Sequence, residues 1–168
     1  MNTARHIGDI EEIKQLKARY LRLVDEKKWD EWVDVFTEDF HAWLGDVPDQ
    51  VLDSREVFIS FIRRAIGAAT TIHHGHMPEI EILGPDTARG IWAMYDYVKF
   101  TGPDGDLELD GYGHYREEYR RGADGRWRIC SLRLTRILGM VEKLEKMAAG
   151  PIIPVSRQAS SEDELARL

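Results

Sequence analysis

Three short clusters of turn-forming residues divide the second half of this sequence into long strand-like segments. The segments span residues 70–83, 87–101, 106–121 and 126–137. The clusters between them are Gly84-Pro85-Asp86, Gly102-Pro103-Asp104-Gly105 and Gly122-Ala123-Asp124-Gly125. Glycine, proline and aspartate in such clusters are typical of hairpins, so the pattern predicts four consecutive antiparallel strands. Glycines within these strands, at positions 75, 90, 111 and 113, favour a strongly bent sheet.

The first part of the chain has helical periodicity instead. Apolar residues recur every three or four positions between Gly8 and Lys27, which predicts an amphipathic helix with charged residues such as Lys17 in solvent. Asp30 is predicted to cap a short second helix, and residues 40–44 to form a brief strand. Ser54 is predicted to cap a third helix. Its expected buried stripe is Val57, Phe58, Phe61, Ile62 and Ile66.

Helices followed by antiparallel hairpins predict an α+β fold with the helices on one face of the sheet. We expect three N-terminal helices inside a cone-shaped barrel of strongly curved, mainly antiparallel sheet, whose interior forms a pocket. Residues 1–150 are predicted to form one domain, with a weakly amphipathic helix over 138–150. Residues 151–168 are expected to be a tail that can dock on a neighbouring subunit. The uncovered sheet face predicts a homodimer or homotrimer.

Composition excludes several classes of protein. The chain has 30 acidic and 23 basic residues, a formal net charge of -7, so it lacks the basic excess of a nucleic-acid-binding protein. It has no apolar run long enough to span a membrane and no apolar signal segment at its start. Cys130 is the only cysteine, which agrees with a reducing compartment. We therefore expect a soluble cytoplasmic protein.

Three of the six histidines, His73, His74 and His76, stand within four residues at the start of the first long strand. Histidine can exchange a proton near neutral pH, so this segment is a candidate for acid–base chemistry. A metal site is the alternative. Side chains alternate along a strand, so His74 and His76 would point one way and His73 the other, and no second ligand cluster has suitable spacing. The spacing therefore favours acid–base chemistry over a metal site.

A catalytic histidine needs a carboxylate that orients its ring. Asp25 lies at the end of the first helix, where simple solvation is the plainer explanation. Asp96 interrupts the otherwise apolar alternation that starts at Trp92 and includes Met94, Val98 and Phe100. A lone acid on such a face is costly unless it is paired or functional.

The remaining candidates come from the other strands and the first helix. Tyr112 and His114 share one face of the third long strand and are predicted to project into the cavity, whereas Tyr115 and Tyr119 are assigned to the core. Arg133 and Arg136 lie on opposite faces of the last strand, and Arg136 is a candidate for contact with an anionic substrate. The phenol of Tyr20 is either a donor in the cavity or a core group with a partner.

The order of these motifs resembles the SnoaL-like branch of the nuclear transport factor 2-like superfamily. The resemblance covers residues 8–140. It rests on Ile13-Lys14-x-Leu16-Lys17-x-x-Tyr20, on an aspartate five residues later, and on the strand motifs His73-x-Gly75-His76-x-Pro78-Glu79-Ile80 and Gly90-x-Trp92…Asp96. Within that branch the chain looks most similar to bile acid 7α-dehydratases, and more distantly to scytalone dehydratases and hexachlorocyclohexane dehydrochlorinases.

The resemblance implies a cofactor-independent lyase that acts on a small hydrophobic, cyclic or steroid- or polyketide-like molecule. It assigns His73 as the base, Asp25 as its partner and Tyr20 as an assisting donor. Asp96, His114, Tyr112, Trp92 and Arg136 are then candidate substrate contacts. His114 stands where the bile acid enzymes have an aromatic residue, which implies a smaller or more polar substrate than a steroid thioester.

Two other kinds of function are compatible with the same fold. An isomerase or polyketide cyclase would use the same proton abstraction without loss of water. A non-catalytic ligand-binding or protein-docking module would have His73 and Asp25 far apart, or an interior filled by aromatic side chains.

Overall fold

The computed structural model describes residues 3–45, 51–103 and 105–138. These residues form three α-helices, a short 3₁₀ turn and six strands. The helices are α1 (Thr3–Asp25), α2 (Trp29–Trp32) and α3 (Arg55–Ile66), with the 3₁₀ turn η1 at Val33–Val35. The strands are β1 (Phe36–Leu44), β2 (Val51–Leu52), β3 (Thr70–Ile82), β4 (Thr87–Gly102), β5 (Gly105–Arg121) and β6 (Trp127–Leu138).

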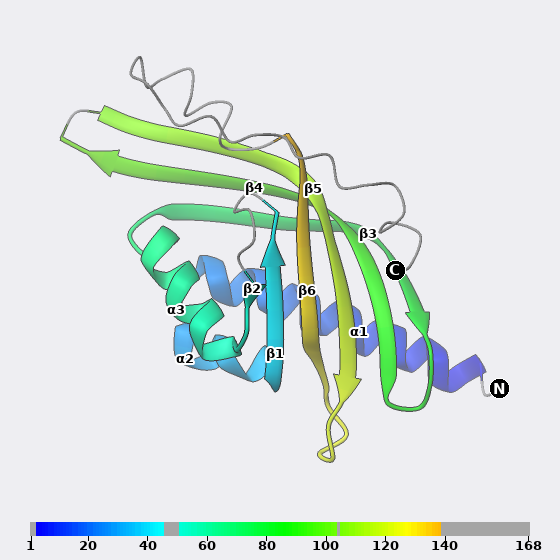
Figure 1. Cartoon of the computed structure of the whole chain (residues 1–168). Helices are drawn as coiled ribbons and strands as arrows, with labels where there is room; N and C mark the ends of the chain where they lie inside the picture. Colours follow the sequence, from blue (N-terminus) through cyan, green and yellow to red (C-terminus); the bar gives the residue numbers. More distant parts are fainter. Residues whose placement is uncertain (1–2, 46–50, 104, 139–168) are drawn as a thin grey trace.

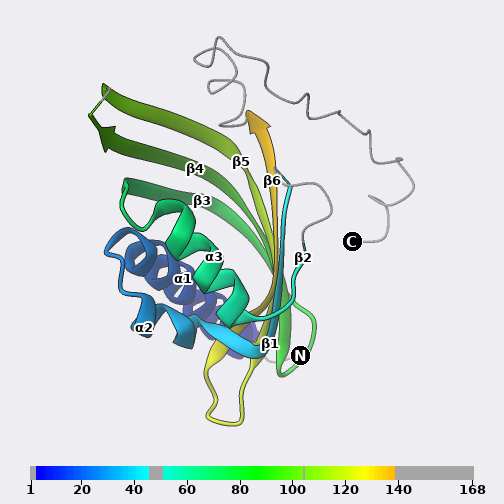
Figure 2. The ribbon, with the colours of Figure 1, turned by 60° about the vertical axis from the view of Figure 1, so that its left-hand side comes forward.

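The six strands form one mixed sheet in the order β2-β1-β6-β5-β4-β3. All neighbouring strands are antiparallel except β1 and β6, which run parallel. The sheet curls around the helices and stays open between its edge strands, β2 and β3 (Figures 1 and 2). The predicted α+β fold with a strongly curved sheet is confirmed, and the turn clusters do separate the long strands.

The sheet has two chemically different faces. On the inner face, which packs on the helices, alternate residues of β4 such as Trp92, Met94, Asp96 and Val98 are buried. Figures 1 and 2 both show that, in the described part of the chain, the helices leave the opposite, outer face of the sheet uncovered. Because directly paired residues of neighbouring strands share a face, the register places each side chain on one face or the other.

The hydrophobic core lies between the inner face and the helices. Helix α1 contributes one buried stripe, made of Ile13, Leu16, Tyr20, Leu23 and Val24. An aromatic cluster closes the core under α3, where the rings of Trp32, Phe36, Phe40 and Phe58 pack with centroids 4.4–5.5 Å apart. This cluster holds the C-terminal half of α1 against the sheet.

Some local predictions need correction. Ser54 does cap α3, since its hydroxyl accepts a hydrogen bond from the Val57 backbone N–H at 3.2 Å. Val57 itself is half exposed, so it does not belong to the buried stripe. Asp30 lies inside α2 rather than capping it, and Lys28 occupies the cap position without a side-chain hydrogen bond. Strand β1 begins at Phe36, four residues earlier than predicted, because Phe36 and Phe40 both face the core.

The C-terminal predictions fall largely outside the described residues. Leu138, the first residue of the predicted terminal helix, belongs to β6. Residues 139–150 and the predicted tail, residues 151–168, lie beyond the described chain, and the predicted homo-oligomer stays a prediction. None of the described helices is both long and apolar enough to cross a membrane.

Candidate active site

The structure brings Asp25 and His73 into direct contact. Asp25 is the last residue of α1, and His73 lies on the inner face of β3, opposite Asp96 of β4. Nδ1 of His73 is 2.6 Å from Oδ1 of Asp25, and the His73 backbone N–H donates to Oδ2 of the same carboxylate at 2.9 Å. The imidazole side chain is 10% exposed and the carboxylate side chain 25% exposed. Two residues that are 48 apart in the sequence therefore form a half-enclosed pair.

The hydrogen bonds to Asp25 keep it ionised. Burial acts to raise the pKa of Asp25, but hydrogen bonds from the ring and backbone of His73 and from Thr71 outweigh burial, and the pKa lies below its usual range. An ionised carboxylate at this distance accepts the Nδ1–H of the ring, which fixes the neutral imidazole in one tautomer. Nε2 receives no hydrogen bond from any residue in the described ranges, so it can act as a base.

Tyr20 lies in the same part of the core, five residues before Asp25 on α1. Its ring packs edge-on against Tyr115 with centroids 6.1 Å apart. Burial raises the pKa of Tyr20 well above its usual value, and the charges of nearby groups, including Glu117, Asp96 and Asp25, raise it further. Tyr20 is therefore a neutral phenol at physiological pH and can donate a hydrogen bond. Its hydroxyl has no hydrogen-bond partner within residues 3–45, 51–103 and 105–138.

A buried ion pair, Lys17–Glu117, lies next to the ring of Tyr20. Lys17 was expected in solvent, but its side chain is only 1% exposed and bonds the fully buried carboxylate of Glu117. The Lys17 ammonium lies 4.1 Å from the ring centroid of Tyr20 and 3.6 Å from that of Tyr115. The prediction was wrong because Lys17, four residues after Ile13 and three before Tyr20, belongs to the buried stripe.

Asp96 and Arg136 form a second buried ion pair on the inner face. The guanidinium of Arg136 donates two hydrogen bonds to the Asp96 carboxylate, at 2.9 and 2.8 Å. This pairing explains the lone acid on an apolar strand face. Gly111 lies directly opposite Asp96 on β5, and a methyl group there would overlap both the carboxylate and the guanidinium. The missing side chain at Gly111 makes room for the pair.

Two predicted site residues lie on the wrong face. Tyr112 pairs with Tyr95 and His114 with Ala93, which places both on the outer face, away from His73. The prediction that they line the cavity with the dyad is therefore wrong, and so is the argument about substrate size drawn from His114. Trp92 does lie on the inner face, but it is a core residue whose indole N–H donates to the Tyr119 hydroxyl at 2.8 Å.

The other histidines and the last strand follow the predicted alternation. His74 pairs with Tyr95 and His76 with Ala93, so both face outward while His73 faces inward. Arg133, unlike Arg136, lies on the outer face, where it stacks on Trp43. No three histidine, cysteine, aspartate or glutamate side chains of the described chain are arranged to hold a metal ion.

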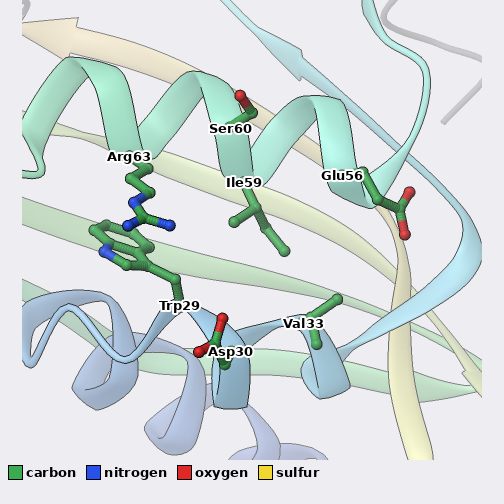
Figure 3. A pocket seen from close by; sticks show the side chains of 7 residues that line it. All are labelled: Trp29, Asp30, Val33, Glu56, Ile59, Ser60 and Arg63. Atoms are coloured by element: carbon green, nitrogen blue, oxygen red, sulfur yellow. The ribbon is translucent and has the colours of Figure 1, made fainter.

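Two hollows outlined by described residues lie away from the dyad. One, of about 750 Å³, is a groove on the outer face that includes Trp43, Arg116 and Arg133. The other, of about 490 Å³, opens between α2 and α3, where Figure 3 shows Trp29 and Arg63 facing each other across it. The inner face near the dyad also carries Tyr20, Tyr115 and the two buried ion pairs.

The lowered pKa of Asp25 predicts how stability depends on pH. Because this group has a lower pKa when folded than when unfolded, its contribution to stability is present above the unfolded pKa, about 3.9, and disappears as the pH falls through the folded pKa. We expect the stability advantage of the wild type over Asp25→Asn to shrink as the pH is lowered from about 5 to about 2. Urea unfolding of both proteins across this range measures it. A difference independent of pH would contradict the prediction.

The matched family agrees with this architecture. Residues 5–133 match the model of the SnoaL-like domain. The chain belongs to the SnoaL-like domain family. Among curated proteins, the Probable cyclase FGR4 of Gibberella zeae is 26% identical to this SnoaL-like chain over 135 residues, which is 74% of this chain and 89% of that protein.

Solved structures share the fold of this SnoaL-like protein. A protein from Novosphingobium aromaticivorans, provisionally named a scytalone dehydratase, is 20% identical with a TM-score of 0.71, over 81% of this chain and 89% of that one. A hexachlorocyclohexane dehydrochlorinase of type 2 is 17% identical, also with a TM-score of 0.71, over 82% of this chain and 90% of that one. These comparisons show the SnoaL-like fold, whereas the particular similarity to bile acid 7α-dehydratases stays a prediction.

Proposed function

We propose that this SnoaL-like protein is a cofactor-independent lyase that eliminates water or another leaving group from a small hydrophobic substrate. The observation that supports this proposal most is the 2.6 Å contact between Nδ1 of His73 and the ionised Asp25. An oriented imidazole with an unbonded Nε2 is the arrangement that general base catalysis requires. A non-catalytic module has no need for such a pair.

The mechanism begins with proton removal from a carbon next to a carbonyl group. Nε2 of His73 takes this proton, and Asp25 stabilises the imidazolium that forms. The electrons of the broken C–H bond move toward the carbonyl oxygen, where the phenol of Tyr20 donates a hydrogen bond to the developing negative charge. As the enolate collapses, the bond to the leaving group on the next carbon breaks. The proton on His73 then passes to the departing hydroxide, which leaves as water.

A cyclase is the second candidate, and the match to a protein named Probable cyclase FGR4 favours it. The same enolate would attack a carbonyl carbon in the same molecule and form a carbon–carbon bond, with no loss of water at that step. An isomerase would return the proton to a different carbon. All three reactions share the abstraction of one acidic C–H proton by His73.

Incubation in D₂O tests this shared step. We expect the wild-type protein to exchange the proton next to the carbonyl for deuterium in a panel of β-hydroxy ketones, β-hydroxy thioesters and poly-β-ketone mimics, as followed by proton NMR. Mass spectrometry then separates the lyase from the cyclase and the isomerase, because of the three only the lyase turns a β-hydroxy substrate into a product lighter by one water. His114→Gln on the outer face is the matched control and should exchange as the wild type does. Binding without any exchange would favour the non-catalytic module.

A further inference from the structure

Lysine occupies a backbone position that normally belongs to glycine, right after α1. Lys27 has a φ of 59°, in the left-handed region. Its N–H bonds the carbonyl of Val24 at 3.3 Å, and the N–H of Lys28 bonds the carbonyl of Leu23 at 3.0 Å. These two bonds are the pattern of a Schellman helix end, in which the left-handed residue is usually glycine because a side chain is strained there. A lysine at this point lowers the stability of the turn.

The side chain of this strained lysine reaches the dyad. Its ammonium donates to the hydroxyl of Thr71 at 2.6 Å, and that hydroxyl donates to Oδ1 of Asp25 at 2.8 Å. The same Oδ1 accepts the bond from the ring of His73. Thr71 and His73 are two residues apart on the inner face of β3, so both can contact one carboxylate. The ammonium also lies 5.9 Å from the ring centroid of Trp29, which lines the hollow between α2 and α3 (Figure 3).

The hydrogen bonds that link Lys27, Thr71 and Asp25 can run in one direction only. An ammonium group can only donate, so the Thr71 oxygen that accepts from Lys27 must turn its own hydrogen elsewhere. The acceptor that it meets is Asp25. Without the ammonium, the hydroxyl would be free to rotate, and the carboxylate would lose both a directed donor and a nearby positive charge. Residues held in strained conformations are concentrated at functional sites, where the surrounding structure compensates their cost.

We infer that Lys27 is a positioning residue, which acts through Thr71 to hold Asp25, and with it His73, in the orientation that proton transfer requires. This role depends on the proposed function for its effect on catalysis. The arrangement of Asp25 itself can be measured without any substrate. The competing explanation is that Lys27 only completes the turn. In that case glycine would stabilise the turn and leave Asp25 unchanged.

Lys27→Gly separates the two explanations, because it relieves the backbone strain and removes the ammonium at once. We expect the melting temperature of Lys27→Gly to rise by about 2–4 °C. This is the shift that relief of one strained backbone position gives in a chain of 168 residues. The carboxyl ¹³C signal of Asp25 should nevertheless titrate at higher pH than in the wild type. Lys27→Met should change that titration in the same direction, and Lys27→Arg should retain the wild-type curve.

Lys28→Met is the matched control. Lys28 is exposed and pairs with Glu26 and Glu31 rather than with Asp25, so its loss should leave the Asp25 titration unchanged. In the D₂O exchange assay, Lys27→Gly should slow the reaction by about tenfold, the value of one lost hydrogen bond. An unchanged Asp25 titration in Lys27→Gly would overturn the inference, whatever the activity. Exchange that is missing in the wild type too would contradict the proposed function, while the titration would still decide the role of Lys27.

Discussion

Replacing Lys17 with methionine is expected to lower the free energy of unfolding by about 3–5 kcal/mol, the usual cost of breaking a buried ion pair from one side. Both side chains of the Lys17–Glu117 pair are buried. Among the described residues, the Glu117 carboxylate would keep a single donor, the hydroxyl of Tyr119 at 2.6 Å. Methionine fills a similar volume, so the loss reports on the charge rather than on a cavity. Chemical denaturation followed by tryptophan fluorescence measures the change.

The double variant Lys17→Met with Glu117→Gln shows whether the unpaired charge causes this loss. It should recover a large part of the lost stability, because it buries no charge without a partner. Lys14→Met is the surface control, since Lys14 lies one turn earlier on α1 and makes an exposed contact with Glu11 at 3.8 Å. Its effect should stay within about 0.5 kcal/mol. Equal losses for Lys14→Met and Lys17→Met would show that the buried pair contributes no special stability.

The second large effect concerns catalysis. Substituting His73 with alanine should slow proton abstraction by about 10²–10⁴-fold, the contribution of a positioned general base. The fold should persist, because His73 lies on the edge strand β3 and its ring keeps some exposure. Deuterium exchange on a substrate identified with the wild type measures the rate. Added imidazole should restore part of the activity of His73→Ala, since it can enter the space that the ring leaves.

The two neighbouring histidines provide an internal control for this experiment. His74→Gln and His76→Gln alter the outer face only, and their rates should remain within about twofold of the wild type. If His76→Gln lost as much activity as His73→Ala, the assignment of the inner face as the catalytic side would be wrong.

Sequence reasoning was most successful where the pattern is local. Turn residues separate the strands, and alternation along β3 correctly divides His73 from His74 and His76. On β5 the same reasoning correctly assigned Tyr115 and Tyr119 to the core. It was wrong to place the cavity on the opposite face with Tyr112 and His114, because the core and the dyad lie on the same, inner face of the sheet.

The supporting groups of the site depend on distant contacts instead. Lys17 meets a residue 100 positions away, and Arg136 meets one 40 positions away. A charged residue in a helix is usually solvated, so the position of Lys17 in the apolar stripe did not outweigh its charge without knowledge of the acid on the facing strand. The left-handed backbone of Lys27 has no signature in the sequence at all, because glycine would be the expected residue there.

Strict alternation along the strands also has a practical consequence for engineering. Every second position of β4 and β5 belongs to the side of the sheet that bears none of the proposed reacting groups. A mutational library restricted to those positions would vary solubility, labelling sites or surface attachment, while the side chains around the imidazole stay unchanged.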